Sequence, residues 1–320
     1  MGCKYYLAAD GGGSKLQAIL YDENFKIVRA CRSNGTNTLF KDKNAVMQSI
    51  CNLIDDILGN DVSVIESVDI CILASADFFC ETLAKRCEIR NLRLLGEETI
   101  ALAAAWKQNG VVALSGTGSF GFVRLEDGVT RTPVGGWGPL LSDDGSGYDI
   151  GLRSIKAAIR SVDGRCPPTV MHDMIMEKWK FSKLRDIISF LNDNTESRHE
   201  IASVSMITSR AAAMGDQVAI DIYKYAAHEM AVQVLTAIKN AGVELTFPIV
   251  TAGGAWKGSS HMFQEFCREV RETYPNAEIL LPEFEPVVGC VISRCFSEGA
   301  VDEQTKAAIY HGFQKFLYPR

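Results

Sequence analysis

The sequence has few of the residue patterns that mark metal centres. Its ten cysteines include no C-x-x-C pair, and its five histidines are scattered, with HEMAV at 228–232 departing from H-E-x-x-H. Several cysteines, such as Cys71 in VDICILA, lie in apolar runs. We therefore interpret them as reduced core residues and expect a cytoplasmic protein. A metal or iron–sulfur site is the alternative.

Patterns for membranes and nucleic acids are also lacking. There is no signal peptide and no apolar run of about 18 residues, so we expect no membrane insertion. The net charge is −6 and no block of like charge occurs, which disfavours binding to nucleic acid or to an anionic membrane. The chain has 320 residues, which suggests two domains or one bilobal unit.

The apolar residues that are present predict an α/β protein. Alternating or continuous apolar runs bounded by glycine or turn residues predict strands, and apolar residues at helical spacing predict helices. The expected strands are 4–10, 15–22, 25–32, 68–73, 111–115 and 248–254, and the expected helices are 42–58, 97–108, most of 146–241 and 302–317.

One unit of this pattern occurs twice. When the first segment is shifted by 105 residues, YYLAADGGGSKLQAILYD lies over VVALSGTGSFGFVRLED. Gly11 then falls on Gly116, and Ser14 falls on Ser119. Each copy is an apolar strand, a G-x-G-S turn and a second strand closed by aspartate. The repeat predicts two related lobes.

The second copy, GTGSFGFV, also fits the glycine loop of protein kinases and the dinucleotide fingerprint G-x-G-x-x-G. No V-A-I-K, H-R-D or D-F-G motif follows, and FGFVRLED is typical of a strand rather than of the helix that a dinucleotide site needs. No Walker loop occurs either. We interpret the turn as a hairpin whose backbone N–H groups bind phosphate, with a plain hairpin as the alternative for a single copy.

Two such turns and a third break from strand to glycine, at Thr251–Gly254, favour a nucleotide-binding cleft between the lobes. Asp10 beside the first turn has the chemistry to hold Mg²⁺, directly or through water.

The motifs AADGGGSKLQAILYD, SNGTN, ALSGTGS, GGWGPLLSDDGSGYDIG and VTAGG occur in this order. Over residues 5–296 the chain resembles the BadF/BadG/BcrA/BcrD ATPase family, and within it the N-acetylglucosamine kinase branch. The resemblance implies a two-lobed actin-like ATPase fold, related to ribonuclease H. We expect lobes at 1–116 and 117–300, with a helix at about 301–320 packed on the first lobe.

The resemblance also implies ligands and roles for matching residues. It implies ATP and Mg²⁺, with Asp10 as metal ligand and catalytic residue, and a homodimer. The implied nucleotide-binding residues are Gly11, Gly12, Gly13, Ser14, Lys15, Gly116, Thr117, Gly118, Ser119, Gly253 and Gly254. The implied sugar-binding residues are Asn37, Asp77, Gly136, Trp137 and Asp143. Core packing is the alternative for Trp137, and capping of the following helix is the alternative for Asp143.

Two positions depart from the family pattern. Where the family usually carries the aspartate that acts as general base, this chain has Glu97, followed by Glu98. First-turn helix acidity is the alternative role for this pair. Where the family commonly has glycines, LASADFF places Ala74, Ser75 and Ala76, which would narrow the substrate site.

The sequence therefore predicts an ATP-dependent kinase acting on an amino sugar or related hexose, with Glu97 as base. One alternative is an ATPase that energises a partner protein through a cysteine-ligated iron–sulfur cluster. The other is a catalytically weak sugar or nucleotide sensor.

Overall fold

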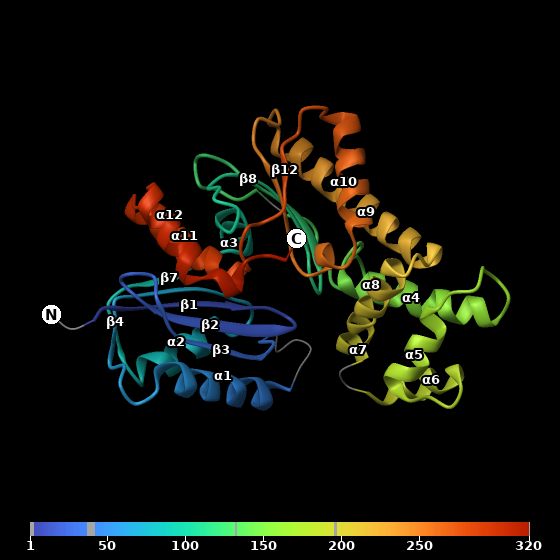
Figure 1. Cartoon of the computed structure of the whole chain (residues 1–320), viewed down its shortest axis with the longest axis horizontal. Coiled ribbons are helices and arrows are strands. Elements are labelled where there is room, and N and C mark those ends of the chain that lie inside the picture. The colour runs from blue at the N-terminus through green and yellow to red at the C-terminus, as the bar shows by residue number, and fades with distance from the viewer. Residues whose placement is uncertain (1–2, 37–41, 132, 195–196, 320) are drawn as a thin grey trace. The chain divides into compact units, whose positions relative to one another are not determined.

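The computed structural model describes residues 3–36, 42–131, 133–194 and 197–319, which form two compact units (Figure 1). Unit 1 contains the chain up to Gln108 together with Pro282–Pro319, and unit 2 contains Asn109–Leu281. These limits differ from the expected 1–116 and 117–300. The boundary expected at 116 lies earlier because residues 110–115 form a strand of the unit 2 sheet. The boundary expected at 300 lies earlier because residues 286–298 pack on the unit 1 sheet.

Unit 1 is built on a five-stranded sheet in the order β3-β2-β1-β5-β7. β1 pairs antiparallel with β2, whereas β1, β5 and β7 run parallel, so their carboxyl ends lie at one edge. The strands are β1 Tyr5–Gly11, β2 Lys15–Asp22, β3 Ile27–Asn34, β5 Ser67–Ile72 and β7 Leu92–Leu94. A separate parallel pair is formed by β4 Val64–Ile65 and β6 Glu88–Ile89.

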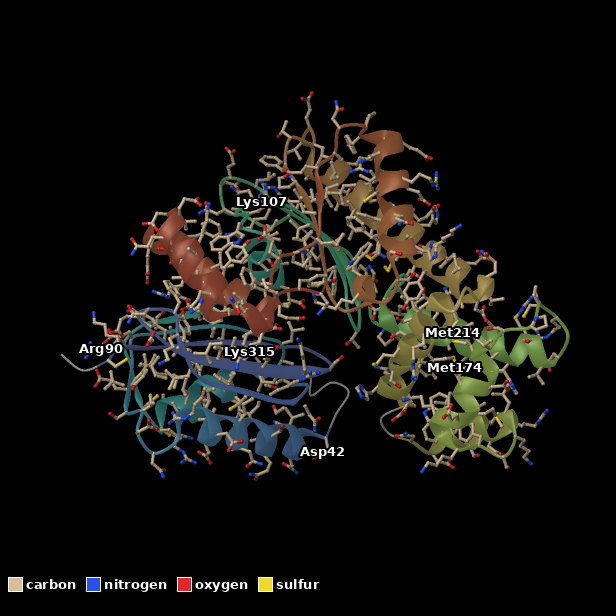
Figure 2. All side chains as sticks on the ribbon, viewed as in Figure 1. Asp42, Arg90, Lys107, Met174, Met214 and Lys315 are labelled. Carbon is tan, nitrogen blue, oxygen red and sulfur yellow. The ribbon has the colours of Figure 1, made fainter. Side chains whose placement is uncertain are left out.

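Helices cover both faces of this sheet. Successive side chains of β1 point to opposite faces, so they enter two different apolar cores. Leu7 and Ala9 join the core under α1, whereas Ala8 joins the core under α11. Asp42 caps α1 by accepting a 2.8 Å hydrogen bond from the Ala45 backbone N–H (Figure 2). The helices of this unit are α1 Lys43–Leu58, α2 Ala76–Ala84, α3 Glu97–Ala103, α11 Pro286–Glu298 and α12 Glu303–Gly312, followed by the short η3 Gln314–Phe316.

Unit 2 has a sheet with the same arrangement, β10-β9-β8-β11-β12. β8 pairs antiparallel with β9 and parallel with β11, which pairs parallel with β12. The hairpin predicted from the sequence repeat is therefore present twice, each time followed by two parallel strands. The strands are β8 Gly110–Ser115, β9 Ser119–Arg124, β10 Val134–Gly135, β11 Ile249–Ala252 and β12 Ile279–Leu280.

The rest of unit 2 is mostly helical, as the sequence predicts for residues 146–241. One large apolar core joins the sheet to α4, α9 and α10. The helices are α4 Gly147–Val162, α5 Met171–Trp179, α6 Ile187–Asp193, α7 Ser197–Ser203, α8 Ser205–Ala213, α9 Gln217–Ala241 and α10 Ser260–Thr273, with short 3₁₀ turns at η1 Leu184–Asp186 and η2 Ala255–Lys257.

The turn after β5 contains a strained residue. Ala74 has φ of 62°, the left-handed conformation that glycine adopts most easily. A non-glycine residue in this conformation destabilises the folded state by about 1–2 kcal/mol. The backbone thus has the shape that glycine favours, although the sequence places alanine there.

We expect Ala74→Gly to stabilise unit 1. Relief of the left-handed strain exceeds the entropy that glycine adds to the unfolded chain, which leaves a net gain of about 0.5–1 kcal/mol. Calorimetry is expected to show a melting temperature higher by about 1–4 °C. Ala307→Gly, at an exposed position inside α12, is the matched control and is expected to lower it. An unchanged or lowered melting temperature for Ala74→Gly would contradict this account of the turn.

Candidate functional site

The first glycine turn joins β1 to β2 and is held by two backbone hydrogen bonds. The Gly12 N–H donates to the Lys15 carbonyl at 3.0 Å, and the Thr36 N–H donates to the Gly12 carbonyl at 2.9 Å. Gly35 lies directly on the turn, because a Cβ there would overlap the Gly13 carbonyl. Gly35 and Thr36 therefore support the turn through their backbone, and only glycine fits at position 35.

The segment after β5 supports the same turn from another side. The Leu73 N–H donates to the Gly11 carbonyl at 2.8 Å, and the Ser75 hydroxyl donates to the Thr36 carbonyl at 2.7 Å. Ser75, at one of the positions where the family carries glycine, thus makes a contact that glycine cannot make. Asp77 is exposed in the first turn of α2, and Asn37 lies outside the described residues.

Asp10 follows the buried run of residues 7–9 in β1, near the carboxyl ends of the parallel strands. Desolvation raises the pKa of its carboxyl group to about 6, and the opposing effect of Lys15 only partly offsets this. Lys15 is itself engaged, since its ammonium group lies 3.3 Å from a carboxylate oxygen of Glu285 and also donates to Gln17. The Glu285 carboxylate adds to the rise in the pKa of Asp10.

Glu97 is the first residue of α3, which begins just beyond the carboxyl end of β7. Desolvation, followed by the charges of Asp10 and Glu98, raises the pKa of the Glu97 carboxyl group to about 7. A helix N-terminus alone would lower this pKa, because it favours the anion. The environment of Glu97 therefore goes beyond ordinary first-turn acidity: it favours a carboxyl group that binds and releases a proton near neutral pH.

The second glycine turn joins β8 to β9 in unit 2. The Gly116 N–H donates to the Gly118 carbonyl at 2.8 Å, and the Gly147 N–H at the start of α4 donates to the Gly116 carbonyl at 2.8 Å. The turn is therefore attached to the first residue of the long helix α4.

Two serine hydroxyls attach the strands beside this turn to the DDGS segment. Ser115 donates to the Gly145 carbonyl at 2.7 Å, and Ser119 donates to the Asp144 carbonyl at 2.7 Å. Because both bonds run from side chain to backbone, they fix the course of residues 144–145 beside the turn. Ser119 thus supports the loop through its hydroxyl group.

Asp143 is buried against the second turn. Its side chain accepts a 3.2 Å hydrogen bond from the Gly138 N–H, and a Cβ on Gly118 would lie 3.3 Å from its carboxylate oxygens. Desolvation raises the pKa of Asp143 above its ordinary value. The helix cap is Ser146, whose hydroxyl accepts from the Asp149 N–H, so the capping alternative for Asp143 is wrong.

The remaining expected site residues of unit 2 lie on two loops. Gly136 packs against the ring of Phe120, and Trp137 is 74% exposed, which excludes the core-packing alternative for this tryptophan. Gly253 has φ of 102° and leaves no room for a Cβ beside the Ser115 carbonyl, so β11 ends close to the second turn. Gly254 is exposed next to it.

Several residues that build the site were not among the predicted ones. Gly35, Ser75 and Glu285 support the first turn or pair with Lys15, and Ser115 and Gly147 support the second. Gly35 lies in the SNGTN motif and Ser115 lies in the ALSGTGS motif, so a close-packing role could have been predicted for both residues. Glu285 is 270 residues from Lys15, and no local pattern indicates their contact.

Within the described residues, no three His, Cys, Asp or Glu side chains are grouped to hold a metal ion. The ten cysteines are all free thiols. Among the described helices, none combines the length and apolarity needed to cross a bilayer.

The topology of both units is that of the actin-like sugar kinases. A glucokinase of the ROK family from Streptomyces griseus superposes with a TM-score of 0.57 at 15% identity, over 90% of this chain and 97% of that one. A structure from Porphyromonas gingivalis, provisionally assigned as an N-acetylglucosamine kinase, gives 0.71 at 17% identity over 92% and 99%. At these identities the similarity shows the fold.

The chain belongs to the BadF/BadG/BcrA/BcrD ATPase family, whose model matches residues 9–293. It is 32% identical over 303 residues to the N-acetylmuramic acid/N-acetylglucosamine kinase of Clostridium acetobutylicum, covering 90% of this chain and 97% of the relative. It is 29% identical over 315 residues to the N-acetyl-D-glucosamine kinase of Dictyostelium discoideum, covering 91% and 98%.

We expect Glu97→Gln to stabilise the Mg²⁺-free protein at pH 8 more than at pH 5. The folded state raises the pKa of Glu97 from 4.5 to about 7. Between these values the folded protein retains a proton that the unfolded chain has released, so the wild-type stability falls as the pH rises. Glutamine cannot ionise, so the variant does not lose stability through this group as the pH rises. Melting curves at both pH values in EDTA test this, and an equal effect at pH 5 and pH 8 would count against a desolvated Glu97.

Proposed function

We propose that this chain is an ATP-dependent kinase that phosphorylates a hydroxyl group of an amino sugar or a related hexose. The observation that carries the proposal is the match along nearly the whole chain to amino-sugar kinases. Both glycine turns, Asp10 beside the first turn and Glu97 at the start of α3 lie on the expected elements, which supports the same interpretation.

The turns are suited to phosphate groups. Residues 11–15 of unit 1 and 116–119 of unit 2 would contact the phosphates of ATP, with Gly253 and Gly254 against its adenosine part. In such turns, successive N–H groups and a nearby hydroxyl group bind anionic oxygens. The close backbone packing at Gly35 and Gly253 keeps each turn rigid before any ligand arrives.

Asp10 is the residue that would hold Mg²⁺. Magnesium usually keeps several waters and needs only one or two carboxylates beside the substrate phosphates. A single aspartate at the carboxyl edge of the parallel strands therefore fits it. This agrees with the lack of a larger ligand cluster among the described residues. When bound, Mg²⁺ neutralises negative charge on the transferred phosphoryl group.

Glu97 would act as the general base. Its carboxylate would take the proton from the attacking sugar hydroxyl group, and desolvation, the largest cause of its raised pKa, makes it a stronger base than an exposed glutamate. Glutamate is one methylene longer than the aspartate of the family pattern. The longer side chain would place the base differently and so affect which hydroxyl group reacts.

The sugar would be recognised by hydrogen-bonding groups and an aromatic wall. Asp143 would accept from sugar hydroxyls, and Gly136 and Trp137 would contact the sugar from unit 2. The family resemblance implies Asp77 and Asn37 as further sugar-binding residues. A pocket for a small polar ligand commonly combines a few such groups with an apolar surface. The exposed indole of Trp137 is available for this role.

Two further properties complete the proposal. The ten free cysteines support a reducing compartment, for which we propose the cytoplasm. The family resemblance supports a homodimer, which light scattering on the purified protein tests directly.

An ADP-release assay with Mg·ATP tests the function. The acceptors are N-acetylglucosamine, glucosamine, N-acetylmannosamine, N-acetylmuramic acid, glucose and a control without sugar. Strong release that depends on an amino sugar is the expected result and names the acceptor. Release without any sugar would instead support the partner-coupled ATPase. Nucleotide binding with no turnover would support the sensor.

With the best acceptor, we expect Glu97→Gln to lower kcat about 10²–10⁴-fold, because general-base assistance has this magnitude. Glu98→Gln is the matched control, since it removes the adjacent carboxylate and is expected to leave kcat within about one order of magnitude. The measurement is kcat at saturating ATP and sugar. A Glu97→Gln enzyme with wild-type kcat would contradict the assigned base.

A further inference from the structure

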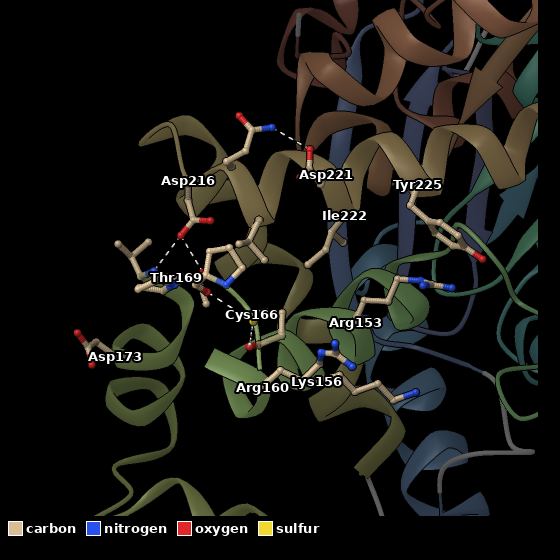
Figure 3. A pocket seen from close by; sticks show the side chains of 16 residues that line it. Arg153, Lys156, Arg160, Cys166, Thr169, Asp173, Asp216, Asp221, Ile222 and Tyr225 are labelled. Carbon is tan, nitrogen blue, oxygen red and sulfur yellow. Dashed lines mark hydrogen bonds between the residues drawn. The ribbon is translucent and has the colours of Figure 1, made fainter. Parts of the chain in front are cut away.

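A groove in unit 2 lies away from the glycine turns, between the second half of α4, the segment Cys166–Val170 and the start of α9 (Figure 3). Its volume is about 880 Å³, which is large enough for a small organic ligand. Apolar side chains form much of its lining, among them Ala157, Pro167, Val218 and Ile222. Such a lining suits an apolar molecular body.

The α4 wall of the groove carries three cations, Arg153, Lys156 and Arg160 (Figure 3). Their spacing along the helix places them on one face. Arg153 lies over the ring of Tyr225, 3.4 Å from its centroid. Lys156 and Arg160 are exposed, and neither forms an ion pair with any residue that the structure describes.

The acidic residues of the groove are engaged elsewhere. The Asp216 carboxylate accepts from the Thr169 hydroxyl group and from the N–H groups of Val170 and Ala219. Asp221 accepts from the Gln217 amide at 2.8 Å. Oδ1 of Asp173 lies 2.7 Å from Nδ1 of His172, within hydrogen-bond distance. Lys156 and Arg160, on the α4 wall, are therefore the charged lining residues that have no partner among the residues the structure describes.

We propose that this groove binds a small amphipathic anion, a phosphate or carboxylate group carried on an apolar body, and that the binding is coupled to the second glycine turn. Lys156 and Arg160 supply the charge for the anionic group. The apolar lining opposite them contacts the body of the ligand. The proposal concerns unit 2 alone and does not depend on the proposed kinase reaction.

The coupling runs through hydrogen bonds that begin in the groove. The Arg153 guanidinium donates from Nε to both carboxylate oxygens of Asp149, at 2.9 and 3.0 Å. Asp149 accepts from the Gly145 N–H at 3.0 Å, and the Gly145 carbonyl accepts from Ser115, the residue before the turn. Arg153 thus connects the groove to the position of Gly116.

An anion beside Lys156 and Arg160 competes with Asp149 for the Arg153 guanidinium group. Loss of that ion pair weakens the hold of Asp149 on the Gly145 N–H. The backbone of the DDGS segment and of the second turn is then expected to exchange its amide hydrogens faster. Arg153 and Asp149 are positioning residues in this description, since neither touches the turn itself.

The test uses 1-naphthyl phosphate as probe, with inorganic phosphate and 1-naphthol as comparators that lack the apolar body or the charge. Calorimetric titration is expected to show tighter binding of the probe than of either comparator. The double variant Lys156→Glu/Arg160→Glu is expected to weaken probe binding at least tenfold. Lys239→Glu, a single charge reversal of the same kind at an exposed position near the end of α9, is the control and is expected to retain wild-type affinity.

Both substituted residues are exposed, so the double variant is expected to keep its circular dichroism spectrum and melting temperature. Equal probe affinity in wild type and double variant would overturn the proposed site. Hydrogen exchange over residues 115–120 and 143–150 supplies the second readout: the probe is expected to accelerate it in the wild type and not in the double variant. Probe binding with unchanged exchange would overturn the coupling.

Discussion

The structure depends on the close approach of backbone to backbone at the two hairpin turns. Gly35 lies on the first turn and Gly253 lies on the second, each where a Cβ would overlap a carbonyl oxygen. Because no side chain intervenes, the turns are fixed by backbone hydrogen bonds and by the ends of neighbouring strands. Rigid turns of this kind hold phosphate without reorganising when it binds. In each unit the turn follows the strand that has a parallel neighbour, and in unit 1 the proposed site residues Asp10 and Glu97 lie at the carboxyl ends of those strands.

The electrostatics of unit 1 favour function over stability. Asp10 and Glu97 are desolvated carboxylates, and the cation nearest Asp10, Lys15, is already paired with Glu285. Of the neighbouring charges that raise the pKa of Glu97, that of Asp10 has the largest effect. Such a pair is expected to lower stability at neutral pH, while a raised pKa suits Glu97 to the proposed role of general base. The left-handed Ala74 adds backbone strain in the same unit.

Much of this organisation could be read from the sequence, because it is local. The repeated strand, turn and strand predicted two related lobes, and the two sheets indeed have the same strand arrangement. The sequence predicted a helix over residues 97–108, whereas α3 ends at Ala103. Trp106 adopts φ of 56°, a left-handed backbone conformation that apolar periodicity does not predict. The ion pair of Lys15 with Glu285 and the packing of Gly35 on Gly13 are tertiary contacts without a sequence period. Position 37 lies outside the described residues, so its expected role stays a prediction.

The central claim is that a desolvated Glu97, beside a charged Asp10, exchanges a proton near neutral pH. Its most direct test is a ¹³C NMR titration of the side-chain carboxyl groups in Mg²⁺-free protein, with the Glu97 signal assigned from its absence in Glu97→Gln. The account predicts a midpoint at about pH 7 for Glu97, shifted to lower pH in Asp10→Asn because one of the charges that raise it is gone. A midpoint near 4.5 that does not respond to Asp10→Asn would contradict the account.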